Sequence, residues 1–550
     1  MITRNPKLKI HPLKGISVNS KSLWPVLAIA GGAFALRLIA LGQRPIWYDE
    51  AFAVLYAEKP FATMLHGTVT QVGGAAADVH PLFFYTILHG WMEAVGQSPI
   101  AVRMLPVLLG TATVAMIYLL ARRLFNGRVG LVAAAIAAVS PFQIYYSQEA
   151  RMYALLGFAA TAMAYFFVRA WTDNRRLDWL AFGFFGAMTL YAHNLGVMFV
   201  AGLDLWIAWV WLTQRAWRWH RLRAVLLSHL LMIGLFAPWL AIVPSQLGKI
   251  QQAYWVEQPG ITQLVQTLLV FHFAYDNEAL PGWLLPLALL ASVLVLTMVL
   301  FELLRQRRNL QADLEQAGWP RNQRLWFLAL LAFVPILLTF VASQIRPVYI
   351  IRALLPSSLA YYVLAAGVLA ARSVPKAIKW GLLVPSVLII AVSLANHYTY
   401  AQFPRPPFDR AAAYLRDQYG PDSVIPARWA GTIVHSNKLS FLPTYYYDRS
   451  LPQAFIADEP LSPSDTLAYP TQQALGLFAT PDLATATQGF DHVWFVVFRR
   501  AIGEYQDAGY TTHPQLAWLD QHYTLVQIVP FNDLDIYEYR SSPTSAAGAR

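Results

Sequence analysis

The sequence predicts a polytopic α-helical membrane protein with a small α/β domain at its C-terminal end. Of its 550 residues, 57% are hydrophobic and only 13% are charged, about half the charged share of an ordinary soluble domain. Apolar runs near the ~20 residues that cross a bilayer follow one another through the first 397 residues. Beyond them, charged residues and turn formers become frequent. The composition excludes intrinsic disorder, and the lack of cysteine excludes a disulfide scaffold.

Eleven apolar runs are candidate transmembrane helices. The first follows residues 1–23, which hold five Lys/Arg and no acid and are expected to be a cytoplasmic N-terminus. No clear cleavage site follows this run, so we expect a retained helix and not a signal peptide. The eleven runs are 24–41, 101–121, 129–145, 153–171, 178–192, 195–213, 224–243, 283–304, 325–342, 353–371 and 378–397.

The distribution of charge predicts which loops face the cytoplasm. Residues 398–550 have a charge balance of −5, so the first 397 residues carry +16, most of it in short loops between apolar runs. That pattern is typical of cytoplasmic loops and not of a nucleic-acid-binding surface. The loop order is consistent only if the apolar segment 81–97 does not span. We therefore predict an interfacial helix there, within a long outer loop over 42–100 that belongs to a membrane domain over 24–397.

The C-terminal region has the composition of a separate domain. The sequence PRPP at 404–407 ends the last apolar run. We expect an extracytoplasmic α/β domain over 398–540 and a disordered tail over 541–550. Its predicted helices are 408–419 and 513–521, and its predicted strands are 491–498, 523–530 and 534–540.

Polar residues gather at the predicted outer ends of the spans. A single charge there is ordinary, because loop ends are where charge is least costly. Five such clusters on one face, opposite the basic loops, indicate a site at one depth. The clusters contain Asp49 and Glu50; Asp78 and His80; Gln148, Glu149, Arg151 and Tyr153; Tyr191, His193 and Asn194; and Arg346 and Arg352.

Five segments carry a family resemblance: WYDEAF (47–52), HPLFFYTILHGW (80–91), RMLPVLLGTATVAMIYLLARRLF (103–125), SPFQIYYSQEARMYAL (140–155) and VYIIRALLP (348–356). Together they resemble the family 39 type of GT-C glycosyltransferases, which includes protein O-mannosyltransferases and the bacterial aminoarabinose transferases of lipid A. The resemblance implies a GT-C fold, a polyprenyl-phosphate-linked sugar donor and an acceptor on the outer face of the membrane. The chain departs from the common family pattern at Leu82 and Ala353. These departures bear on the assignment of the acceptor more than on the resemblance to the superfamily.

The resemblance also implies roles for individual residues. Asp49 falls where the family has its base, with Glu50 beside it, and Glu149 matches a second acid. Arg352 matches the basic residue that holds the donor phosphate. Further candidates are Arg151 and Arg346 for the phosphate and His80, Tyr153 and His193 for substrate.

The chemistry of such a transfer agrees with these residue types. A phosphate is a good leaving group, so the reaction needs cations for the departing phosphate and one carboxylate for the acceptor's proton. Arginine suits bidentate phosphate binding. Direct attack on C1 with a single base inverts the anomeric configuration.

Several alternatives stay open at this point. Arg151 is equally plausible as a structural partner of Glu149, and Asp204 lies in mid-span. No cofactor is expected; a divalent cation is possible, but the spacing of His66, Asp78, His80 and His89 matches no standard ligand motif. The rival class is a transporter or a flippase for lipid-linked sugars, which places ionisable residues near the midplane. We expect an inner-membrane enzyme with a lipid, glycan or protein acceptor, in contact with membrane lipids and with no nucleic acid.

Overall fold

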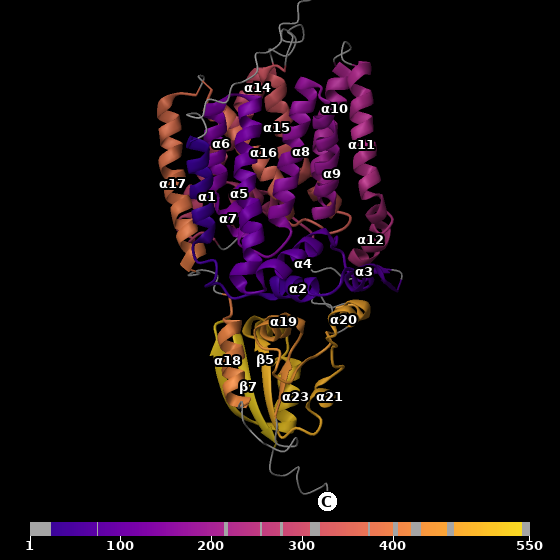
Figure 1. Cartoon of the computed structure of the whole chain (residues 1–550). Helices are drawn as coiled ribbons and strands as arrows, with labels where there is room; N and C mark the ends of the chain where they lie inside the picture. The colour runs from indigo at the N-terminus through magenta and orange to yellow at the C-terminus, as the bar shows by residue number, and fades with distance from the viewer. Residues whose placement is uncertain are drawn as a thin grey trace, which may run out of the picture.

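The computed structural model places a helical bundle above an α/β domain (Figure 1). It describes residues 24–73, 75–213, 218–252, 256–275, 279–307, 319–371, 374–399, 405–419, 431–458 and 467–541. The predicted cytoplasmic N-terminus (1–23) and all but the first residue of the predicted tail (541–550) lie outside these residues.

The bundle has the helices that the apolar runs predict. Eight described helices are long and apolar enough to cross a membrane, and the bent pair α6 and α7 makes a ninth if the two helices are counted as one broken span. Two more, α1 and α9, occupy predicted runs but have only 15 and 17 residues, so the expected number of eleven is not established. The bundle helices are α1 (Trp24–Leu38), α5 (Pro99–Leu124), α6 (Gly127–Val139), α7 (Pro141–Ser147), α8 (Tyr153–Asp173), α9 (Arg176–Ala192), α10 (Gly196–Thr213), α11 (Arg218–Leu240), α14 (Leu285–Arg307), α15 (Arg321–Ser343), α16 (Leu355–Leu369) and α17 (Lys376–Thr399).

The predicted span 129–145 is two helices, which corrects the sequence-based expectation of one. The axes of α6 and α7 differ by 60°. Ser140 caps α7 by accepting the backbone N–H of Gln143, and Pro141 occupies its first turn, where a proline loses no hydrogen bond. Arg37 of α1 fills the break, because its guanidinium donates to the carbonyl of Ala138 (3.3 Å) and to Oγ of Ser147 (3.0 Å). The bend directs the loop after α7 towards the end of the bundle.

A layer of short helices covers that end of the bundle. Helix α4, predicted as an interfacial helix, lies across the bundle axis together with α2 (Figure 1). Its buried residues, Phe84, Tyr85, Leu88 and Met92, share one face of the helix, as an amphipathic helix requires. The layer contains α2 (Tyr48–Ala57), α3 (Phe61–Val69), the strands β1 (Gln71–Val72) and β2 (Ala75–Ala76), α4 (Phe83–Val95) and α12 (Val243–Gln252). Another short helix, α13 (Ile261–His272), packs against α14 of the bundle, and His272 lies 2.7 Å from the Tyr361 hydroxyl of α16.

The C-terminal region is an α/β domain with a five-stranded sheet in the order β4-β3-β5-β7-β6. The first three strands are parallel, and β7 pairs antiparallel with both β5 and β6. The predicted strands and helices are present, but β3 and β4 were missed because they have only four and three residues. The elements are α18 (Phe408–Tyr419), β3 (Thr432–His435), α19 (Lys438–Tyr447), β4 (Gln453–Phe455), α20 (Tyr469–Leu475), α21 (Leu483–Thr487), β5 (His492–Phe498), α22 (Arg499–Asp507), α23 (Pro514–His522), β6 (Tyr523–Phe531) and β7 (Leu534–Ser541).

This domain docks onto the outer loop. The Tyr447 hydroxyl accepts the backbone N–H of Ile46 (2.8 Å), and Thr471 donates to the carbonyl of Gly67 (2.7 Å). A Cβ on Gly67 would lie 2.5 Å from that of Ala474, so only glycine permits this approach of α20 to α3. The C-terminal domain is therefore fixed against the layer that covers the bundle.

Candidate active site

Most of the predicted site residues converge at the end of the bundle that faces the C-terminal domain (Figure 1). They come from helix ends and turns, including the 3₁₀ helix η4 (Ile351–Leu354) that precedes α16. Arg346 is not among them: it lies exposed in the turn after α15, and no ion pair joins it to a carboxylate in the described part of the chain. The residues brought together are Asp49, Glu50, His80, Glu149, Arg151, Tyr153, His193 and Arg352.

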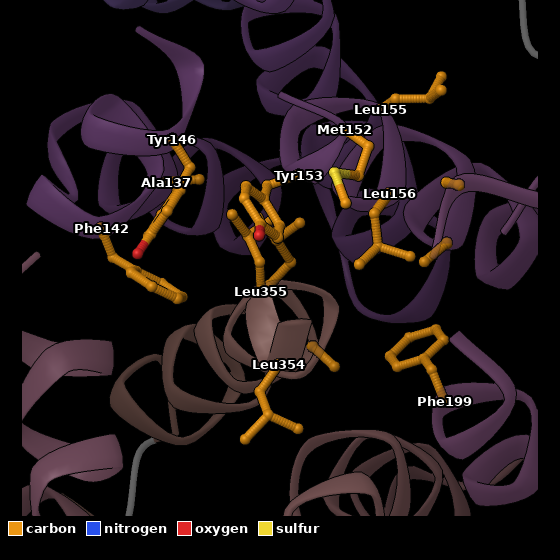
Figure 2. Close-up of a cluster of buried hydrophobic side chains, with 14 of the residues drawn as sticks. Ala137, Phe142, Tyr146, Met152, Tyr153, Leu155, Leu156, Phe199, Leu354 and Leu355 are labelled. Carbon is orange, nitrogen blue, oxygen red and sulfur yellow. The ribbon is translucent and has the colours of Figure 1, made fainter. Parts of the chain in front are cut away.

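An apolar floor holds the loop between α7 and α8. Figure 2 shows Tyr146 and Tyr153 above Leu354 and Leu355 of the facing segment. The rings of Tyr146 and Tyr153 are 5.1 Å apart and edge to face. A Cβ on Gly157 would lie 2.4 Å from Leu355 Cδ2, so α8 and α16 are in close contact at this point. Close packing of this kind leaves the loop little freedom to move.

Asp49 and Arg352 face each other at the surface of the site. Asp49 lies in the first turn of α2, where a negative charge is favourable, and its Oδ2 is 3.9 Å from Arg352 Nη1. Their side chains are 18% and 20% exposed. The Arg352 guanidinium lies 5.5 Å from the centre of the Tyr153 ring. A substrate can thus approach both the carboxylate and the cation.

Glu50, predicted as a second catalytic acid, is enclosed by the protein. Its carboxylate is fully buried and accepts hydrogen bonds from both Nε and Nη2 of Arg103, at 2.8 and 2.7 Å. The backbone N–H of Ala150 donates to the same carboxylate (3.0 Å). Burial alone would raise the pKa of Glu50, but Arg103 and Arg405 hold it below its usual value. In this structure the Glu50 carboxylate is therefore held by protein groups and supports the local fold of the site.

Glu149 is also buried, and its partner is not the expected one. Its Oε1 accepts Nη2 of Arg405 at 2.6 Å. The side chain of Arg151 makes no ion pair with it among the described residues, and the two are joined only through the backbone N–H of Arg151 and the carbonyl of Glu149 (2.7 Å). The interpretation of Arg151 as the structural partner of Glu149 was therefore wrong, and Arg405 has that place.

Arg151 and His80 form a second polar group beside Asp49. Arg151 Nη1 donates to the Tyr85 hydroxyl (3.2 Å) and to the carbonyl of Asp49 (3.4 Å), and Nη2 lies 3.4 Å from His80 Nε2. His80 Nδ1 lies 2.9 Å from Asp78 Oδ1. Because arginine can only donate and the carboxylate can only accept, His80 carries its proton on Nδ1 and presents the Nε2 lone pair to Arg151. Asp78 thus fixes the orientation of His80.

The turn that carries Asp78 and His80 is held from outside. Asn194 donates to the carbonyl of Val79 (2.9 Å), and Gln246 of α12 donates to the carbonyl of Asp78 (3.2 Å). Asn194 also donates to Gln246 Oε1 (3.1 Å). Two amide side chains from distant segments therefore keep His80 against Arg151.

His193 lies beside His80 and Tyr153, at ring-centre distances of 6.5 and 6.1 Å. Its Nδ1 accepts the backbone N–H of Leu195 (3.1 Å), so the neutral ring is protonated at Nε2. Burial, together with the positive charges of Arg352 and Arg151, lowers the pKa of His193 to about 3. His193 is consequently a neutral hydrogen-bond donor at physiological pH and not a cation for a phosphate.

The lowered pKa of His193 predicts a loss of stability in acid. The unfolded chain binds a proton near the ordinary value of 6.5 and the folded chain only near 3, so between these values unfolding takes up a proton and stability falls as the pH falls. The loss is at most about 1.4 kcal/mol per pH unit. Thermal unfolding in detergent between pH 7 and pH 4.5 should therefore show a steeper decline for the wild type than for His193→Gln. The exposed His66→Gln is the control; parallel curves for the wild type and His193→Gln would contradict the prediction.

Of the four candidate metal ligands, only Asp78 and His80 are in contact with each other. Among the described residues, no group of three or more His, Asp and Glu is arranged to hold a metal ion. His66 contacts Thr70, and His89 lies against the carbonyl of Ala57 (2.7 Å). The sequence-based possibility of a divalent cation therefore gains no ligand set from His66, Asp78, His80 and His89.

Two arginines that sequence analysis did not select complete the site. Arg103 begins the RMLP segment and Arg405 lies in PRPP, which was interpreted only as a helix break. An arginine in the first turn of an apolar span is a signal for a buried ion pair, because an unpaired charge there is costly. No local signal identified Arg405, whose partners lie 256 and 355 residues away.

The arrangement can bind an anion and accept a proton side by side. The accessible carboxylate of Asp49 can take a proton from a hydroxyl, while Arg352 and Arg151 can stabilise negative charge on a phosphate. Glu50, Arg103, Glu149 and Arg405 form the buried support beneath them.

Comparisons with known proteins agree with this architecture. A family model described as dolichyl-phosphate-mannose-protein mannosyltransferase matches residues 79–242. The structure of ArnT from Cupriavidus metallidurans in the apo state is 13% identical, with a TM-score of 0.60, and covers 94% of this chain and 98% of that one. ArnT bound to undecaprenyl phosphate is 14% identical, with a TM-score of 0.54 and the same coverage.

A third similar structure is the archaeal oligosaccharyltransferase AglB from Archaeoglobus fulgidus in complex with an inhibitory peptide and a dolichol-phosphate. It is 12% identical, with a TM-score of 0.51, and covers 95% of this chain and 74% of that one. No curated protein matches the sequence. At these identities the likeness establishes the fold, which is the GT-C fold expected from the sequence.

Proposed function

We propose that this chain, which has the GT-C fold and resembles protein O-mannosyltransferases and ArnT, transfers a sugar from a polyprenyl-phosphate donor to an acceptor. The family model and the ArnT-like fold support a transferase that uses a lipid-linked sugar. The observation that carries the proposal is that Arg151 is buried without a directly paired anion. The roles in the reaction are assigned to Arg151 and to the residues next to it.

Arg151 is a buried cation held by neutral groups. The residue is 3% exposed, and its side chain contacts a backbone carbonyl, the Tyr85 hydroxyl and His80. In the described part of the chain, it makes no ion pair and its Nε has no hydrogen-bond partner. The carboxylates of Asp49 and Asp78 act on Arg151 only from beyond ion-pair distance, and burying a guanidinium without a directly paired anion is costly. A donor phosphate would supply that direct anionic partner and an acceptor for Nε.

The location of Arg151 and Arg352 favours a phosphate that belongs to a lipid. Both residues lie where the bundle ends, so a phosphate between them can keep its prenyl chain beside apolar helices. One ArnT structure holds undecaprenyl phosphate and the AglB complex holds a dolichol-phosphate, which supports a polyprenyl phosphate for this chain also.

The proposed reaction is a direct displacement. The acceptor oxygen attacks C1 of the sugar, the bond from C1 to the phosphate oxygen breaks, and the polyprenyl phosphate leaves with the electron pair. Asp49 takes the proton of the acceptor, and Arg352 and Arg151 stabilise the departing phosphate. Because one base assists a single displacement at C1, the product has the inverted anomeric configuration.

We place the site on the outer face of the inner membrane. The basic residues Arg122 and Arg123 lie in the last turn of α5, and Arg128 lies in the first turn of α6; these helix ends are at the end of the bundle opposite the C-terminal domain (Figure 1). The positive-inside rule assigns that end to the cytoplasm. The acceptor, whether lipid, glycan or protein, would then be extracytoplasmic.

The test is transfer by the purified protein. Mass spectrometry of lipids that copurify with it should reveal a phosphate-linked polyprenyl sugar, and the same radiolabelled lipid should donate its sugar to an acceptor from a membrane extract. Movement of the labelled lipid across a vesicle without sugar transfer would instead support the transporter or flippase class. Neither transfer nor movement of any polyprenyl-phosphate sugar would overturn the proposal.

We expect Arg352→Ala and Arg151→Ala each to weaken binding of undecaprenyl phosphate by about 10- to 100-fold. The reason is that each loses a hydrogen bond to a charged group, worth about 1.5–3 kcal/mol. The lysine variants should fall between alanine and wild type, since they keep the charge and lose the planar fork. Binding can be measured by calorimetry in detergent. Arg123→Ala, at the other end of the bundle, is the matched control; unchanged affinity in both site variants would place the phosphate elsewhere.

A further inference from the structure

Arg405 is the residue at which the C-terminal domain enters the site. It precedes α18, and its side chain is 4% exposed. Its backbone carbonyl accepts Asn532 Nδ2 (3.3 Å), from the turn between β6 and β7. The backbone of Arg405 is thus fixed to the C-terminal domain, while its guanidinium reaches into the end of the bundle.

The guanidinium joins both buried acids. Arg405 Nη2 donates to Glu149 Oε1 (2.6 Å) and to the Tyr145 hydroxyl (3.0 Å), and Nη1 lies 3.4 Å from Glu50 Oε2. It also stacks over the Trp47 ring, 4.5 Å from the ring centre. These contacts use several N–H groups of the planar guanidinium at once, and the single ammonium group of a lysine cannot reproduce them.

Each acid that Arg405 holds is close in sequence to a residue with a chemical role. Glu50 follows Asp49 in the first turn of α2, and Glu149 precedes Arg151 by two residues. The carboxylate of Glu50 also accepts the backbone N–H of Ala150. A displacement of the two buried carboxylates would therefore displace Asp49 and Arg151 relative to each other.

We propose that Arg405 is a positioning residue through which the docked C-terminal domain sets the separation between Asp49 and the phosphate-binding arginines. Among the described residues, the side chain of Arg405 contacts Glu50, Glu149, Tyr145 and Trp47, and none of the residues assigned to the donor phosphate. The inference rests on the proposed transfer reaction for its kinetic consequence. Its structural consequence, the order of α2 and of the 148–151 loop, can be measured without any substrate.

The variants are Arg405→Met, which keeps most of the volume, and Arg405→Lys, which keeps the charge. Arg405→Met should lower the turnover number about 10²-fold, because a misplacement of about 1 Å costs that much in rate. Affinity for undecaprenyl phosphate should change by less than about threefold, because Arg405 does not contact Arg151 or Arg352. Arg405→Lys should recover part of the turnover. Arg449→Met is the matched control, since Arg449 also joins this domain to the outer loop, through Glu58 (3.0 Å), away from the site.

Two further measurements keep the outcome interpretable. In a Glu149→Gln background, Arg405→Met should cost much less turnover than in the wild type, because the residues act through one contact. Hydrogen–deuterium exchange should rise at the start of α2 and in the 148–151 loop in Arg405→Met but not in Arg449→Met.

Wild-type turnover in Arg405→Met, or equal losses of turnover and donor affinity, would overturn the positioning role. If Arg405→Met does not fold, Arg405→Lys is the variant that tests the proposal. Turnover and hydrogen–deuterium exchange at the wild-type level in Arg405→Lys would then overturn the positioning role. If the exchange pattern appears but the wild type transfers no sugar, the proposed function fails and the positioning role stands.

Discussion

Replacing Asp49 with asparagine is expected to slow sugar transfer by about 10²–10⁴-fold, the usual cost of losing a general base. Asp49 is the predicted acid that stays accessible, since Glu50 and Glu149 are both bound to buried arginines. Asparagine has nearly the same shape, so the fold should be unaffected. Binding of undecaprenyl phosphate should be retained or tightened, because Asp49 no longer competes for Arg352, 3.9 Å away.

Transfer rate and phosphate affinity must be measured on the same preparations. Glu58→Gln is the control: Glu58 directly follows α2 and pairs with Arg449, an exposed contact whose loss should cost less than about 1 kcal/mol. Activity of Asp49→Asn within a few-fold of wild type would remove Asp49 from the role of base. Loss of both activity and phosphate binding would mean that Asp49 supports the site and does not react.

The second large effect is on stability. Replacing Arg103 with methionine should lower the free energy of unfolding by about 3–5 kcal/mol, the cost of leaving one member of a buried ion pair alone. Arg103 and Glu50 are 1% and 0% exposed. Arg103 also donates to the carbonyls of Leu41 and Arg44, at 2.8 and 2.7 Å, and so fixes the turn before α2. Thermal and denaturant unfolding in detergent would measure the change.

A double-mutant cycle separates this pair from general damage to the core. Arg103→Met combined with Glu50→Met should cost less than the sum of the single changes, because no carboxylate is then left buried. Arg123→Met, which breaks an exposed pair with Asp173 at the other end of the bundle, should cost less than about 1 kcal/mol. Additive single effects, or a loss for Arg103→Met no larger than the control, would contradict the prediction.

Much of the membrane domain could be predicted because its signals are local. Apolar runs and basic loops identify helices from composition alone, and α5, α8 and α15 lie where those runs predict them. The break at Ser140 and Pro141 was missed although its signal is local: serine before proline marks a helix start. The same attention to helix caps would have divided the predicted span 129–145.

The site illustrates a different limit. All three of Asp49, Glu50 and Glu149 were selected from the sequence as catalytic acids at the outer ends of spans, with Asp49 in the place of the family's base. The structure distinguishes them by burial: Asp49 is accessible, Glu50 faces Arg103 and Glu149 faces Arg405. Which acid meets which arginine depends on contacts across the fold, and no periodicity or spacing encodes them.

The sequence by itself determined that the chain is a membrane protein with a C-terminal α/β domain and that its polar motifs gather at one end of the bundle. These properties follow from the free energy of transferring apolar side chains into the bilayer and from the periodicity of side chains along helices and strands. Both can be read from short stretches of sequence. Only the tertiary structure decided that Arg405 holds Glu149, that Asp78 orients His80 and that Arg151 lies buried among neutral partners. Those pairings join segments up to 256 residues apart, and they depend on how the helices and the C-terminal domain pack.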